Sequence, residues 1–121
     1  MAQAAMLPAA PVREAPAIDR AHLKQMTFGD RGLERELLQL FDRQAELLLA
    51  RMRAGEAAVL ATLAHTLKGS ALGIGASEVA HSAAAAEAAA AGSPAQRDAA
   101  LDCLAAAVDA ARVEISALLR A

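Results

Sequence analysis

The sequence predicts an all-α fold, an antiparallel up-and-down four-helix bundle with a short additional helix at its N-terminal end. Three observations lead to this prediction. Alanine dominates the 121 residues whereas valine, isoleucine and aromatic residues are scarce, a composition that favours closely packed helices over sheets. Apolar residues recur at spacings of three and four in several long segments. Short glycine-bearing loops separate these segments, so consecutive helices must lie side by side and antiparallel.

The first two predicted helices begin at aspartates. Asp19 can cap a short helix over residues 20–26, and Asp30, just after Gly29, can cap a second helix over residues 31–53. One side of the second helix is expected to face the core, with Leu33, Leu37, Leu40, Gln44, Leu47 and Leu48. A second apolar stripe lies beside it, with Leu38, Phe41, Ala45, Leu49 and Met52. Either the short first helix covers this second stripe, or part of it stays exposed to dock a partner.

The third predicted helix covers residues 56–72 and ends at Gly73 and Gly75. Its expected core stripe consists of Leu60, Leu63, Leu67 and Ala71. Ser77 can cap a fourth helix, which is almost entirely alanine and stops at Gly92. We interpret it as a thin helix that lets its neighbours approach closely.

A capping-box signature starts the last helix, with Ser93, Pro94 and Gln96. The apolar face of this helix carries Leu101, Leu104, Val108, Ala111, Ile115 and Leu118. Cys103 lies within the same helical pattern and is expected to be a small buried apolar residue. As the single cysteine, it excludes an internal disulfide framework.

Charge and composition exclude several classes of function. The formal net charge is −2 and the basic residues are dispersed, so no basic stripe for nucleic acid is visible. No apolar run is expected to reach the length of a membrane span. Residues 1–17 form an Ala/Pro-rich segment that we expect to be flexible, without the features of a signal peptide, and residues 18–121 form the bundle domain. We therefore expect a free-standing, monomeric, cytoplasmic protein that binds neither nucleic acid nor membranes.

The stretch HTLKGSALGIG, residues 65–75, places three notable side chains away from the core. With Leu60 at zero and about 100° per residue, the core stripe lies within about 60°, Lys68 at about 80°, His65 at about 140° and Gly69 at about 180°. Glycine opposite the core has no packing role and weakens a helix. We therefore expect Gly69 to bare the surface beside the imidazole. These residues alone favour, slightly, the alternative that His65 is an ordinary polar surface residue over the hypothesis that it belongs to a functional site.

The same stretch resembles the signature of histidine-containing phosphotransfer (HPt) domains, His-x-x-Lys-Gly-[Ser/Ala] followed by a glycine-bearing turn. The matching residues are His65, Lys68, Gly69, Ser70 and Gly75. The resemblance covers residues 18–121 and includes the preceding stretch GDRGLERELLQLFDRQAELL. It departs from the family in the fourth helix, where alanines replace the usual leucines.

The resemblance implies a phosphorelay protein of two-component signalling. His65 would accept a phosphoryl group from a receiver-domain aspartate and pass it to another receiver domain, between a hybrid histidine kinase and a response regulator. Lys68 would stabilise the phosphoryl charge and Gly69 would leave room for it. The chain has no P-loop or kinase-type glycine-rich loop, so we expect no kinase or ATP-binding activity and no cofactor, with Mg²⁺ brought by the receiver domain. Candidates for contact with that partner are Leu49, Ser70 and Leu72.

Glu87 is expected to stand beside His65. If the third and fourth helices turn back near residue 76, residues whose numbers add to about 152 lie level along the antiparallel pair. The family commonly has an acidic or amide residue at this place. Glu87 could then hold the proton on one ring nitrogen and leave the other nitrogen to attack. A solvated surface carboxylate is an equal alternative.

Three other functions remain open at this point. A metal site built from His22, His65 and His81 matches no ligand spacing. A histidine-kinase dimerisation helix would lack its ATP-binding domain. A degenerate helical adaptor would bind receiver domains without phosphotransfer. The intact His65 and Lys68 favour phosphotransfer over this adaptor.

Overall fold

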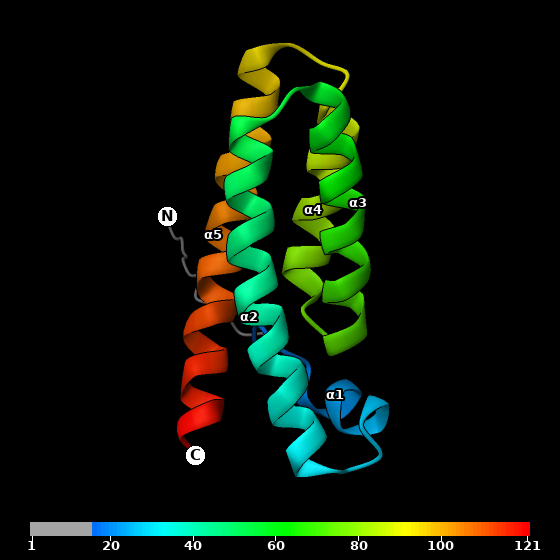
Figure 1. The fold of residues 1–121 in the computed structure, drawn as a ribbon, viewed down its shortest axis with the longest axis vertical. Helices are drawn as coiled ribbons and strands as arrows, with labels where there is room; N and C mark the ends of the chain where they lie inside the picture. The colour runs from blue at the N-terminus through cyan, green and yellow to red at the C-terminus, as the bar shows by residue number, and fades with distance from the viewer. Residues whose placement is uncertain (1–15) are drawn as a thin grey trace, which may run out of the picture.

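The computed structural model describes residues 16–121, and the regular structure within them is entirely α-helical. The helices are α1 (Arg20–Met26), α2 (Arg31–Ala54), α3 (Ala57–Ile74), α4 (Ser77–Ala89) and α5 (Pro94–Arg120). The four long helices alternate in direction, and α1 lies at one end of the bundle next to α3 (Figure 1). The bundle is closed, because α2 packs on α3, α3 on α4, α4 on α5 and α5 on α2. The predicted fold class is confirmed. Of the segment predicted to be flexible, residues 1–17, all but Pro16 and Ala17 lies outside the described residues.

Side-chain caps start three helices at the predicted residues. The Asp19 carboxylate accepts the backbone N–H of His22 at 3.1 Å at the start of α1. Asp30 accepts the equivalent N–H, three residues on, at 3.0 Å at the start of α2. Both reciprocal bonds of the α5 capping box, between Ser93 and Gln96, are formed. Each bond satisfies an N–H group that has no partner inside its own helix.

The turn between α3 and α4 differs from the prediction. α3 continues through Gly73 and ends at Ile74, and the left-handed residue that follows is Gly75, with φ of 80°. The cap position of α4 is Ala76, and Ser77 is the first residue of the helix. No side chain makes a capping hydrogen bond there, so the prediction that Ser77 caps α4 is wrong. An interior glycine is a small penalty that packing on both sides of a helix overrides. A glycine by itself therefore did not locate the helix end.

The chain before α1 is fastened to the bundle at two places. The Glu114 carboxylate on α5 accepts the backbone N–H groups of Ala17 and Ile18, at 2.8 and 3.1 Å. The N–H of Asp19 donates to the carbonyl of Gly75 at 2.8 Å. A Cβ on Gly75 would lie 2.8 Å from the Asp19 carbonyl oxygen, so both its left-handed backbone and this close approach require glycine.

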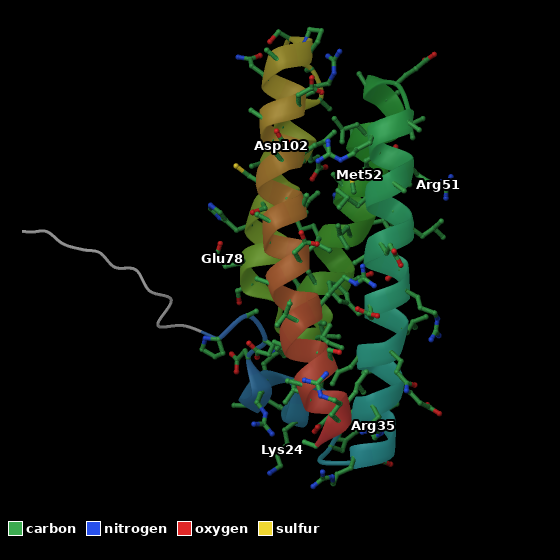
Figure 2. All side chains as sticks on the ribbon, turned by 90° about the vertical axis from the view of Figure 1, so that its left-hand side faces the viewer. Lys24, Arg35, Arg51, Met52, Glu78 and Asp102 are labelled. Atoms are coloured by element: carbon green, nitrogen blue, oxygen red, sulfur yellow. The ribbon has the colours of Figure 1, made fainter. Side chains whose placement is uncertain are left out.

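The core face of α2 is the second of the two predicted stripes. Its buried residues are Leu38, Phe41, Ala45, Leu48 and Met52. In the first stripe, Leu48 is buried and Leu37 is partly buried against the core, but the prediction is wrong for Leu40 and Leu47, which are 54% and 59% exposed. Figure 2 shows Met52 turned into the bundle and Arg51, which continues the first stripe, turned outward.

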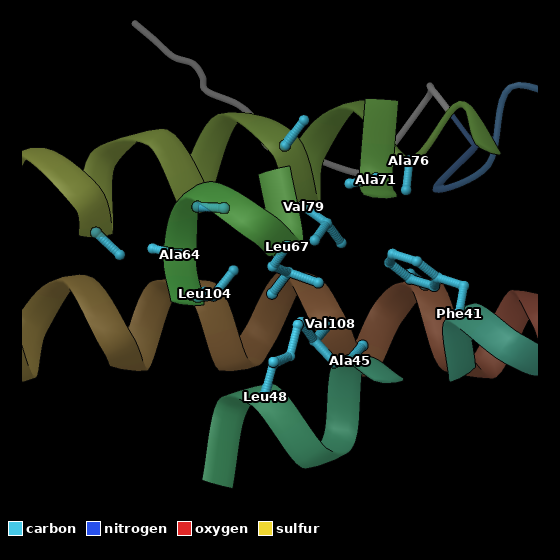
Figure 3. Packing of buried hydrophobic residues seen from close by; sticks show 14 of the residues in the cluster. Phe41, Ala45, Leu48, Ala64, Leu67, Ala71, Ala76, Val79, Leu104 and Val108 are labelled. Carbon is cyan, nitrogen blue, oxygen red and sulfur yellow. The ribbon is translucent and has the colours of Figure 1, made fainter. Parts of the chain in front are cut away.

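Close packing explains why α2 turns this way. Figure 3 shows Ala45 and Leu48 of α2 next to Val108 of α5 and below Leu67 of α3, with Phe41 further along α2 in the same interior. The small Ala45 lets the helices approach, and the larger residues one turn away fill the space on either side. The first stripe contains more leucines, but the number of leucines does not decide which side of α2 is buried. The fit of large and small side chains against α3 and α5 decides it.

The other helices largely follow their predicted stripes. Buried on α3 and α5 are Leu60, Leu63, Leu67, Ala71, Leu101, Leu104, Val108, Ala111 and Ile115, and Leu118 is partly buried. α4 ends at Ala89, three residues before Gly92, and contributes Val79, Ala80, Ala83 and Ala86 to the core. The prediction for Cys103 is wrong, because this residue is exposed, one position before the buried Leu104.

α3 is long and apolar enough to span a membrane by length and composition alone, with 18 residues and a mean hydropathy of 1.3. The expectation that no apolar run reaches the length of a membrane span is therefore wrong for α3, because its many alanines and leucines raise the mean hydropathy of the helix. In the bundle, α3 packs against α1, α2 and α4 with its apolar side. Its outer side carries Thr62, His65 and Thr66, which are exposed.

Candidate functional site

His65 lies in the middle of α3 and points out of the bundle. Its neighbours Ala64 and Leu67 are fully buried, and the helical period then turns position 65 outward, as the sequence predicts. The side chain of His65 is 67% exposed. The imidazole is therefore accessible to another protein.

The carboxylate of Glu87 on α4 engages both His65 and Lys68. Nδ1 of His65 lies 3.1 Å from Oε2 of Glu87, and Nζ of Lys68 lies 3.2 Å from Oε1. The imidazole of His65 and the ammonium group of Lys68 therefore contact different oxygens of Glu87 and do not compete for the same one. The antiparallel turn after α3 brings positions 65 and 87 level, which is where the turn geometry predicts them.

The charge state of Glu87 fixes the arrangement of protons on His65. The hydrogen bond from Lys68 is the main cause that holds the pKa of Glu87 below its ordinary value, and partial desolvation opposes it. The charges of Lys68 and His65 lower this pKa further. Glu87 is therefore ionised at neutral pH and can only accept hydrogen bonds. In the neutral imidazole, Nδ1 then carries the proton and Nε2 carries the free lone pair.

Gly69 leaves open space one turn beyond His65. A Cβ at this position would meet no atom within 4 Å, and the same is true of Gly73 one turn further along α3. Neither glycine has a positive φ, so the backbone does not require glycine at these positions. Because Gly73 is predicted to end the helix, the sequence prediction does not include this second open position. The sequence does contain a signal for it, because His65, Gly69 and Gly73 are four residues apart and such residues share one face of a helix.

The predicted partner residues do not all share this face. Leu72 is 57% exposed, and Ser70, also on α3, is half-buried. Leu49 is partly buried against the core, on the side of α2 that also carries Asp42 and Arg53. Because both of those residues pair with α5, Leu49 faces α5 and not His65. The structure therefore does not bring Leu49 to the histidine, and its contact with a partner stays a prediction.

Two leucines of α2, Leu40 and Leu47, lie on its outer surface. Leu40 and Leu47 are on the side away from the α5 pairs, which is the side next to α3. Figure 1 shows α2 and α3 side by side. Leu72, on the same helix as the two glycines, is also exposed.

His22 is a contact that sequence analysis missed. Its Nε2 lies 3.0 Å from the carbonyl oxygen of Leu72, in the last turn of α3, where carbonyl groups lack helical partners. The contact holds α1 beside the end of α3. The sequence suggests a role for His22 only in the alternative of a metal site. Across residues 16–121, no three His, Cys, Asp or Glu side chains gather to hold a metal ion.

Comparison with known families gives one match. The family profile of the Hpt domain matches residues 35–120, more than two thirds of the chain. Searches of curated proteins and of solved structures gave no match. The matched span contains the exposed His65, its partner Glu87, Lys68 and Gly69. The chain therefore belongs to the Hpt domain family, whose members carry out histidine phosphotransfer in phosphorelays and interact with receiver domains.

Proposed function

We propose that this protein accepts a phosphoryl group on Nε2 of His65 from the aspartyl phosphate of one receiver domain and passes it to the aspartate of another. The observation that carries the proposal is the contact of Glu87 with Nδ1 of an exposed imidazole. This contact leaves Nε2 as a nucleophile that faces solvent. A hybrid histidine kinase and a response regulator are the proposed sources of the two receiver domains. The Hpt family match supports the reaction class.

Acceptance of the phosphoryl group is a displacement at phosphorus. The lone pair of Nε2 forms the new P–N bond, and the P–O bond to the aspartate breaks. The aspartate leaves as a carboxylate, and the ring of His65 becomes a cation because Nδ1 keeps its proton. Lys68, one turn away, is placed to turn from Glu87 towards the phosphoryl oxygens. Mg²⁺ belongs to the receiver domain in this proposal.

The surface around the histidine supports docking of another protein. Gly69 and Gly73 leave the backbone of α3 bare, and Leu72 on the same helix is exposed. Apolar side chains beside an accessible polar group are typical of protein interfaces. We propose that a monomer in the cytoplasm presents this face to each receiver domain in turn.

Labelling from a phosphorylated receiver domain tests the proposal. A receiver domain charged with radiolabelled acetyl phosphate and Mg²⁺ is mixed with wild type, His65→Gln or His81→Gln. Wild type and His81→Gln should acquire acid-labile label, and His65→Gln should acquire none while folding normally, because an exposed side chain contributes little to stability. Label on His65→Gln would overturn the assignment. Binding of wild type to the receiver domain without label would favour the adaptor alternative.

A further inference from the structure

We propose that Phe28, at the corner between α1 and α2, is an anchor that docks the receiver domain and determines which receiver domains this protein accepts. The proposal rests on the proposed function and adds a contact outside the phosphorylation site. The side chain of Phe28 is 92% exposed, more than any other large apolar side chain of residues 16–121. The second phenylalanine of the chain, Phe41, is buried in the core, where an aromatic ring is expected.

The backbone at Phe28 has a conformation that phenylalanine rarely adopts. Its φ is 55°, and within residues 16–121 it is the only non-glycine residue with a positive φ. The N–H of Phe28 donates to the carbonyl of Gln25 at 3.3 Å, and the N–H of Gly29 donates to the carbonyl of Lys24 at 2.9 Å. This pair of bonds ends a helix with a left-handed residue, which is usually glycine or asparagine because a Cβ is crowded there. A bulky side chain at this position weakens the fold.

The fold of the isolated chain therefore gives no reason for phenylalanine at position 28. The ring lies in water and gains nothing from burial, while the backbone favours a different residue. Residues that oppose the stability of the fold are typical of functional surfaces, and aromatic residues often dominate the binding energy of an interface. Phe28 also precedes residues 35–120, which the Hpt profile matches, so the family match does not account for it.

The surface between His65 and Phe28 is continuous. Leu72 lies two helical turns after His65 on the same face of α3 and is 57% exposed. His22 contacts the carbonyl oxygen of Leu72 at 3.0 Å, and Met26, one turn further along α1, is 49% exposed. Phe28 follows two residues later. Figure 1 shows α1 at the end of α3, with the connection from α1 to α2 at the same end of the bundle.

This continuity identifies the receiver domain as the occupant. A helix rises about 1.5 Å per residue, so His65 is roughly 14 Å along α3 from its last residue, Ile74, beside α1. A domain of about 100 residues has a radius of gyration of about 13 Å, so one seated over His65 extends as far as α1. An accepted receiver domain then offers an apolar recess that buries the ring of Phe28. Receiver domains without this recess leave the ring in water and bind less tightly.

Transfer kinetics of Phe28→Asn test the proposal. The probe is the receiver domain that transfers fastest to wild type within a purified panel, or binds most tightly if none transfers. Asparagine suits the left-handed backbone and removes the ring. We expect KM for the receiver domain to rise about tenfold with kcat unchanged, because an anchor contributes to binding and not to the chemical step. Phosphorylation by phosphoramidate, a small-molecule donor, should not change, and Tm should not fall.

The matched control is Val113→Asn. Val113 is 70% exposed on α5, which lies across the bundle from α3. This substitution also replaces an exposed apolar side chain by asparagine, but on a different face. It should leave KM for the receiver domain at the wild-type value.

A tryptophan probe measures burial of the side chain directly. The chain has no tryptophan, so Phe28→Trp and Val113→Trp each contain a single one. When the receiver domain is added and its own emission is subtracted, the emission of Phe28→Trp should shift to shorter wavelength, and that of Val113→Trp should not. Phe28→Trp should also keep a KM close to that of wild type, because it keeps an aromatic ring.

Several results would overturn the proposal. These are an unchanged KM in Phe28→Asn, an equal rise in Val113→Asn, and an emission of Phe28→Trp that does not shift at saturation. A lower Tm of Phe28→Asn would show that the fold uses the ring. A shift that grows with the concentration of Phe28→Trp alone would assign the ring to a contact between two copies of the chain. Failure of the proposed function looks different, because wild type would then acquire no label while the emission of Phe28→Trp still reports docking.

Discussion

Replacement of Gly69 by glutamine is expected to stabilise the bundle and to block phosphotransfer. Glycine in a helix interior is about 1 kcal/mol less favourable than alanine, and glutamine is close to alanine on this scale. A Cβ at position 69 would meet no atom within 4 Å, so alanine fits without a clash and a longer side chain leaves the helix into open space. For a domain of roughly 100 residues, 1 kcal/mol corresponds to a rise in Tm of about 4–8 °C. We expect Gly69→Ala and Gly69→Gln to raise Tm by a few degrees.

The effect on transfer should have the opposite direction. Residues four apart on a helix face are about 5–6 Å apart at Cβ, so a glutamine at position 69 reaches the space beside the imidazole of His65. Displacing the reacting atoms by about 1 Å can lower a rate about 100-fold. We therefore expect Gly69→Gln to reduce transfer from a receiver domain by about that factor, with a smaller effect for Gly69→Ala.

Thermal melts by circular dichroism and transfer rates on the same samples would measure both effects. Gly73→Gln is the matched control, because Gly73 has the same open surroundings in α3 but lies two turns from His65. It should show a similar change in Tm and a smaller loss of transfer. Transfer by Gly69→Gln at the wild-type rate would refute the idea that Gly69 provides clearance.

Two further substitutions probe the site and the core. Lys68→Ala should fold normally and exchange phosphoryl groups about ten times more slowly in both directions, because one part-exposed charge-assisted contact is lost; unchanged rates in a rapid-quench assay would mean that Lys68 is only a solvated charge. Leu48→Ala should lower the free energy of unfolding by about 2–5 kcal/mol in urea titrations, and Leu40→Ala by less than about 0.5 kcal/mol, since only the first is buried. Equal losses would contradict the assigned rotation of α2.

Local signals in the sequence predicted the helices and the site, because both depend on neighbours along the chain. Capping residues such as Asp19 and Ser93 bond within one helical turn. The position of Glu87 beside His65 follows from counting residues back from the short connection between α3 and α4. The rotation of α2 could not be obtained this way. It depends on how Ala45 fits against two other helices, which is a property of packing and not of spacing.

The same distinction applies to Leu49 and His22. Leu49 lies on the α5 side of α2, a position that follows from the rotation of this helix and not from the spacing of its leucines. The contact of His22 with the Leu72 carbonyl joins residues 50 apart, and no pattern within either helix encodes it. Long-range contacts between a side chain and a backbone carbonyl leave no periodic trace in a sequence.

The fastening of α1 has a consequence for amide hydrogen exchange. This helix has seven residues and buries one of its own side chains, Leu23, so it has far less packing than the four long helices. It can open locally without the bundle unfolding, and its amide protons should exchange first. Because His22 bonds to Leu72 on the exposed end of α3, a partner that covers this end would slow exchange in α1 without touching most of it. The amides of α1 thus offer a built-in reporter of whether the histidine face is occupied.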